Sequence, residues 1–90
     1  MKIESDDILA EASCLMAGPR EEAYGSIEDN WTRTGIIWGA ILGLPPIPAE
    51  TVGIMMAGLK ISRIANDSTH TDNYIDAVAY LAGAGSLACN

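Results

Sequence analysis

Apolar residues recur along this chain at the spacing of a helix, and no stretch alternates between apolar and polar residues as a strand would. From Ile8 to Met16 the apolar side chains share one helical face, and Gly18-Pro19 marks the end of this segment. Ser5 can cap its first turn. The polar stretch 19–25 is then predicted to be a connector between two helices.

A second helix is predicted from Ser26, where the sequence SIED is close to a capping box, to Gly43. The stiff segment LPPIP separates it from a third helix, whose first turn suits Pro48. The turn NDSTHT, whose side chains can bond their own backbone, precedes a fourth helix capped by Thr71. The pattern therefore predicts an all-α fold, a single helical domain of residues 1–90 built as a compact bundle of about four helices.

The core that these helices can form is thin, because its side chains are mostly small. The chain is 49% hydrophobic, but it has nine Gly and no Phe. With 90 residues and small side chains a lone subunit buries little area, which favours assembly into a homo-oligomer. The positions predicted to face inward are Ile8, Leu9, Ala12, Leu15 and Met16, then Ile27, Trp31, Thr34, Trp38 and Ile41, then Val52, Met55, Met56, Leu59 and Ile64, and finally Ile75, Val78, Ala79 and Ala82.

Charge narrows the range of partners. With 12 acidic and 5 basic side chains the chain has a formal net charge of −7, which disfavours nucleic-acid polymers and anionic membranes as partners. A small phosphorylated ligand stays compatible, because local geometry can outweigh the mean field. The N-terminus lacks the apolar core of a secretory signal, and prolines interrupt the longest apolar stretch. We therefore expect a cytoplasmic protein, with Cys14 and Cys89 as free thiols.

Opposite charges are predicted to meet across the last two helices, which a short turn should fold into an antiparallel hairpin. Counting outward from the turn places Arg63 level with Asp76, and Lys60 near Tyr80. Asp72 shares a helical face with Asp76 and Tyr80. Three interpretations are open: a structural ion-pair network, a metal site, or half of an anion pocket.

The other bases favour the pocket. Arg20 precedes Tyr24-Gly25, and Arg33 follows Asn30, so four of the five cations could converge on the hairpin. Arginine binds phosphate through two parallel bonds, and aromatic rings stack on a nucleobase. The acids would orient the cations or hold Mg²⁺ against the phosphate. The predicted ligand-binding residues are Arg20, Tyr24, Asn30, Arg33, Lys60, Arg63, Asp72, Asp76 and Tyr80, of which Asp72 and Asp76 are the candidate metal ligands.

These residues occur in a fixed order, with Trp38, Leu42-Gly43 and Met55-Met56 between them. In this order the chain resembles a family of small tailed-phage and prophage proteins, from about residue 6 to 84. The chain departs from the family pattern at Ser26-Ile27, where His-Pro is usual, and at Ala79-Tyr80, where Gly-Tyr is usual. The resemblance implies a phage protein in the cytoplasm of an infected bacterium. With the predicted pocket, it suggests a nucleotide-binding protein that sequesters a host defence signal, such as a cyclic oligonucleotide, without catalysis.

More loosely, that family is similar to the all-α nucleotide pyrophosphohydrolases of the MazG type. Those enzymes pair an E-x-x-E helix with an E-x-x-D helix, so that four carboxylates hold Mg²⁺ at a triphosphate. This chain has no E-x-x-E, and only Asp72 and Asp76 resemble half of the set. The sequence therefore favours binding over catalysis. The alternatives are a Mg²⁺-dependent nucleoside triphosphate pyrophosphohydrolase and a structural or protein-interaction subunit.

Overall fold

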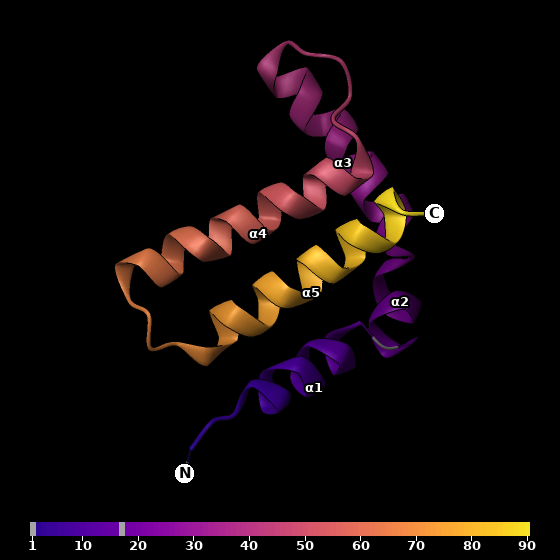
Figure 1. The fold of residues 1–90 in the computed structure, drawn as a ribbon. Coiled ribbons are helices and arrows are strands. Elements are labelled where there is room, and N and C mark those ends of the chain that lie inside the picture. Colours follow the sequence, from indigo (N-terminus) through magenta and orange to yellow (C-terminus); the bar gives the residue numbers. More distant parts are fainter. Residues whose placement is uncertain (1, 17) are drawn as a thin grey trace.

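The computed structural model describes residues 2–16 and 18–90, apart from the side chains of residues 18–20. This part of the chain is all-helical, as predicted, and contains no strand. The expected number of about four helices was wrong, because residues predicted as a connector form a short helix. The five described helices are α1 (Ser5–Leu15), α2 (Gly18–Tyr24), α3 (Ile27–Leu42), α4 (Ala49–Asn66) and α5 (Thr71–Ala88) (Figure 1).

The additional helix, α2, begins where the preceding one was predicted to stop. A proline cannot continue a helix, but its fixed φ suits the first turn of the next one. Pro19 occupies that position in α2, and Glu21 places a carboxylate in the same turn, near the positive end of the helix dipole. The Gly18-Pro19 pair therefore separates two helices instead of opening a loop.

The helix caps agree with the sequence in part. The Ser26 hydroxyl accepts the backbone N–H of Asp29 at 3.1 Å, as its SIED sequence predicts. Gly43 ends α3 in the left-handed conformation, with φ 69°, which costs glycine little. The other two predicted caps were wrong. Glu4 replaces Ser5, because the Asp7 carboxylate accepts its N–H at 2.8 Å, and His70 replaces Thr71.

Helices α4 and α5 form the predicted antiparallel hairpin (Figure 1). In its turn, an Asp67 oxygen accepts the N–H of Thr69 at 3.0 Å and its hydroxyl at 2.6 Å. The Tyr74 hydroxyl donates to the carbonyl of Ser68 at 2.9 Å, which ties α5 to the turn. Helix α1 packs against α5, and α3 packs against α4, so the hairpin is the element around which the others are placed.

The core consists of small residues, which allows the helices to approach closely. Among the residues whose burial is described, Val52 is the largest fully buried side chain, and the other buried apolar side chains are those of alanines. The indole of Trp31 lies directly over Gly53 of α4 and Gly83 of α5, where a Cβ atom would overlap with it or crowd it. Because glycine and alanine occupy the contacts, several larger side chains stay outside. Of the positions predicted to face inward, Leu9, Ile41, Met55, Leu59 and Ala82 are exposed.

The second half of α3 and the loop 43–48 stand out at one end of the hairpin (Figure 1). The loop folds back along α3, where Ile47 N–H donates to the Gly35 carbonyl at 3.0 Å and Leu44 N–H to the Gly39 carbonyl at 2.8 Å. None of the described helices combines the length and apolar character that a membrane crossing needs. Cys14 and Cys89 are free thiols, as predicted, and both are exposed.

Candidate functional site

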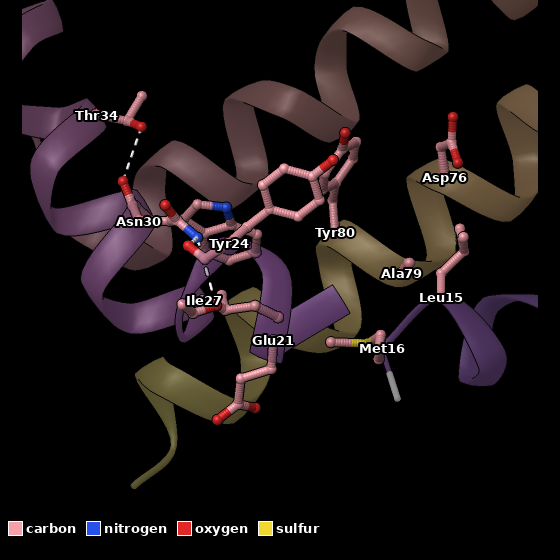
Figure 2. Close-up of a pocket in the computed structure, with 12 residues that line it drawn as sticks. Leu15, Met16, Glu21, Tyr24, Ile27, Asn30, Thr34, Asp76, Ala79 and Tyr80 are labelled. Carbon is pink, nitrogen blue, oxygen red and sulfur yellow. Dashed lines mark hydrogen bonds between the residues drawn. The ribbon is translucent and has the colours of Figure 1, made fainter. Parts of the chain in front are cut away.

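A cavity of about 360 Å³ lies where the end of α1 meets α2, α3 and α5 (Figure 2). We call it the aromatic cavity, because rings from three of these helices line it. Its volume is at the small end of the range for ligand sites in proteins. The lining residues are Leu15, Met16, Glu21, Tyr24, Gly25, Ile27, Asn30, Trp31, Thr34, Asp76, Ala79 and Tyr80.

Two of the aromatic side chains are fixed by packing, and the third is exposed. The ring centroids of Trp31 and Tyr80 are 6.3 Å apart with planes inclined at 53°. Trp31 cannot shift toward the hairpin, because Gly53 and Gly83 already allow its closest approach. Tyr24 is exposed, and its ring extends from α2 toward Tyr80 (Figure 2). The cavity therefore has a rigid aromatic wall and an aromatic side chain at its solvent side.

Asn30 fixes the geometry between α2 and α3. Its side-chain amide donates to the carbonyl of Tyr24 at 2.6 Å, and its side-chain oxygen accepts from the Arg33 guanidinium at 3.2 Å. The Asn30 backbone carbonyl accepts the Thr34 hydroxyl at 2.8 Å. Asn30 therefore has a structural role: its side chain ties α2 to α3 through Tyr24 and joins Arg33 to a residue that lines the cavity.

Asp76 brings a charged pair to the cavity. The Lys60 ammonium lies 2.9 Å from an Asp76 carboxylate oxygen, and their side chains are only 13% and 29% exposed. The other described ion pairs, Lys2–Glu4 and His70–Asp67, are much more exposed. Shielding from water strengthens an electrostatic interaction, so the Lys60–Asp76 pair is held more firmly than a surface pair.

Arg63 was predicted to lie level with Asp76 but does not pair with it, because Lys60, three residues earlier on α4, takes that place. Arg63 instead lines a shallow hollow at the hairpin tip, together with Asp67 and His70. There the Thr69 hydroxyl and N–H, followed by His70, hold the pKa of Asp67 below its usual value. Asp72 is exposed in the first turn of α5, outside both the cavity and the hollow.

The structure thus brings together part of the predicted set. Arg20 belongs to α2, but its side chain is outside the described part of the chain. Tyr24, Asn30, Asp76 and Tyr80 line the aromatic cavity, Arg33 and Lys60 are each bonded to a lining residue, and Arg63 and Asp72 lie elsewhere.

The predicted list of ligand-binding residues leaves out several lining residues, of which Glu21 and Trp31 carry the most chemistry, although the sequence pattern already places Trp31 near the predicted pocket. Glu21 was assigned to a connector between helices. The signal in the sequence that could have predicted α2 is Pro19, because proline suits the first turn of a helix. Trp31 was assigned to the inner face of its helix, and it is indeed half-buried, but one side of its ring faces the cavity. A large ring at a helix junction can serve the core and a site together.

Metal binding has little support in the observed arrangement. Within residues 2–16 and 18–90, no three His, Cys, Asp or Glu side chains come together as a group that could hold a metal ion. Asp76 lines the cavity, whereas Asp72, the other acid predicted to hold Mg²⁺, does not. The two acids therefore do not converge on one point of the cavity, as a shared Mg²⁺ would require.

Comparison with known proteins gives a family and one distant relative. The family described as "Domain of unknown function (DUF6378)" matches residues 7–88. The chain is similar to the Gene 55 protein of Mycobacterium phage L5, with 33% identity over 73 residues. The alignment covers 81% of this chain and 47% of that protein, so the chain spans about half the length of its curated relative. No solved structure matches. These matches support the predicted family of uncharacterised phage proteins and do not show the looser similarity to the MazG type.

Proposed function

We propose that this chain, which belongs to the DUF6378 family, is a phage protein that binds a small nucleotide in the aromatic cavity without turning it over. One observation carries the proposal: a preformed cavity combines a rigid aromatic wall with polar and charged side chains from different helices. A nucleotide has the matching chemistry, a planar base joined to a charged phosphate. The cavity lies within one subunit, so the proposal does not depend on assembly.

The base is assigned to the aromatic side of the cavity. Trp31 and Tyr80 form the fixed wall, and Tyr24 can close over a planar ligand from the solvent side. Stacking on an aromatic side chain contributes roughly 1–3 kcal/mol per base. It does not distinguish strongly between bases, so their polar edges must be recognised by other groups.

The polar edge of the base is assigned to Asp76. One of its carboxylate oxygens is taken by Lys60, which fixes the side chain, and the second oxygen can accept an N–H of the ligand. A carboxylate accepts hydrogen bonds only, so it selects bases that present amino or ring N–H donors. Guanine and adenine both present such donors at their edges.

The phosphate is assigned to the side of Arg33. Its guanidinium donates one N–H to Asn30, which lines the cavity, and the Arg33 side chain is exposed. An arginine has five N–H donors, so enough remain for two parallel bonds to a phosphate. The volume of about 360 Å³ suits one nucleoside unit, so a larger cyclic oligonucleotide would insert one base and leave the rest at the rim.

Calorimetric titration with adenosine and guanosine monophosphates, their triphosphates and cyclic mono- and dinucleotides tests the assignment. Arg33→Gln should weaken binding roughly ten- to hundredfold, because it removes a charge-assisted contact. Arg63→Gln, the matched control at the hairpin tip, should leave binding unchanged. If Arg63→Gln costs as much as Arg33→Gln, the phosphate does not bind where we place it.

A second matched pair tests the base edge. Asp76→Asn should weaken binding, while Asp72→Asn, one turn earlier on the same helix and outside the cavity, should not. If no nucleotide binds the wild type and Asp76→Asn only lowers the melting temperature, the charged pair is a structural contact. The structural-subunit alternative then stands.

Incubation of the bound complex with Mg²⁺ distinguishes binding from hydrolysis. We expect the nucleotide to be recovered intact after heat denaturation, with no pyrophosphate released, since the acids of the described residues form no group that could hold a metal ion. Sequestration of a host signalling nucleotide requires this behaviour. Pyrophosphate release that Asp76→Asn abolishes would instead favour the pyrophosphohydrolase alternative.

A further inference from the structure

The single chain exposes more surface than a folded monomer of its size. Its accessible surface is 6163 Å², whereas monomeric proteins of 9.5 kDa expose about 5,000 Å². Its radius of gyration is 14.0 Å, against about 12 Å for a compact domain of 90 residues. The surplus of about 1,100 Å² is comparable with the roughly 800 Å² that each partner buries in a standard interface.

Part of this additional exposed surface belongs to an apolar segment that has no charged residues and projects from the hairpin. We define the α3 arm as Ile36, Ile37, Ile41, Leu42 and Leu44, whose side chains are all more than half exposed. No charged residue occurs between Arg33 and Glu50, and this part of the chain stands out from the hairpin (Figure 1). Monomers rarely leave such a cluster of large aliphatic side chains in water.

One side of α3 is covered by the chain itself, which determines the face of the helix that is available for contact with another molecule. The returning loop lies against Gly35 and Gly39 through the carbonyls of Ile47 and Pro45. At 100° per residue, Ile37 and Ile41 lie on the opposite side of the helix. Ile41 is 75% exposed, the most of any large apolar side chain described. The arm is thus stiffened on one side by its own loop and open on the other.

From these observations we infer that the α3 arm is the contact surface between two copies of this chain. A two-fold interface joins the same patch on both subunits, and an apolar patch without charge is compatible with itself. Contact through the arms also keeps the acids responsible for the net charge of −7 away from the interface. A net charge of that sign disfavours an anionic membrane surface as the occupant.

Sedimentation velocity of the 90-residue chain from 1 to 200 µM tests the inference. The wild type should sediment as a species heavier than 9.5 kDa at the upper concentrations. The double variant Ile37→Lys/Ile41→Lys should raise the dissociation constant at least a hundredfold and give a monomer. The matched control is Ile54→Lys/Ile61→Lys on α4, whose isoleucines are 53% and 55% exposed, and it should assemble as the wild type does.

Circular dichroism shows whether each variant keeps its helices. If the double variant loses them, the milder Ile41→Gln should still raise the dissociation constant about tenfold. A wild type that stays monomeric at all concentrations overturns the inference, and so does dissociation by the α4 control but not by the arm variants. Flotation with phosphatidylcholine vesicles adds one more outcome: a monomer that binds vesicles through the arm would mean that lipid, not a second copy, covers it.

Discussion

Two glycines of α4 lie five residues apart, and replacing each by alanine should change the stability of the protein in opposite directions. Gly53 lies under the Trp31 indole, and a Cβ atom at this position would overlap with one ring carbon and lie 2.7 Å from another. Gly58 is in the interior of the same helix, with nothing within 4 Å of its Cβ position. Substitution by alanine improves the helix propensity equally at both sites, so a difference between the variants reports the contacts of the new Cβ atom at Gly53, chiefly with Trp31.

The magnitudes follow from the two environments. Replacing glycine by alanine in an exposed helix interior stabilises by about 0.5–1 kcal/mol, which we expect for Gly58→Ala. At Gly53 the same gain is opposed by overpacking, which typically costs about 1–3 kcal/mol. Trp31 cannot move aside toward α5, because its ring already lies against Gly83, and Ala84 of α5 lies 3.1 Å from the new Cβ position itself. We therefore expect Gly53→Ala to be less stable than Gly58→Ala by about 2 kcal/mol.

Thermal unfolding followed by circular dichroism measures this difference. For a domain of this size 1 kcal/mol corresponds to about 4–8 °C, so the two melting temperatures should differ by about 8–16 °C. A displaced Trp31 ring must also enter the aromatic cavity, so Gly53→Ala should weaken nucleotide binding and Gly58→Ala should not. Equal stabilisation by both substitutions would refute the close packing of Trp31 against α4, and with it the rigid wall of the cavity.

Three further perturbations test local features of the fold. Ser26→Ala removes the cap of α3 and should destabilise the protein by about 1 kcal/mol in urea unfolding. Asn30→Ala releases the Tyr24 carbonyl, so amide hydrogen exchange in α2 should accelerate several-fold while α5 keeps its protection. The lowered pKa of Asp67 means that its contribution to stability is complete above its unfolded pKa, about 3.9, and is lost as pH falls through the folded value. Thr69→Ala should raise the pKa of Asp67 toward its usual value, as measured by a carboxyl NMR titration. The variant should also lose less stability than the wild type as the pH falls through this range.

The helical class and most helix boundaries could be predicted because they depend on neighbours in sequence. Ser26 caps through a residue three positions away, and Gly43 ends a helix through its own backbone freedom. The inner faces were less predictable, because they depend on how closely the helices approach. Glycines at 35, 39, 53 and 83 bring backbone or an indole ring into contact, and these contacts leave Ile41 in solvent although it fits the helical pattern.

The alignment of the two hairpin helices explains why Asp76 pairs with a different basic residue from the one predicted. In an antiparallel pair, a shift of three residues is close to one helical turn, so the same helical faces still meet while each charge moves to the next neighbour. The observed partners fit such a shift: Asp76 pairs with Lys60, whereas Arg63 lies at the tip of the hairpin. The length and bonding of the turn set the register, and here the Asp67 carboxylate holds the turn through Thr69. The consequence is chemical, because Lys60 reaches the aromatic cavity through Asp76, which leaves Arg33 to bind the phosphate in our proposal.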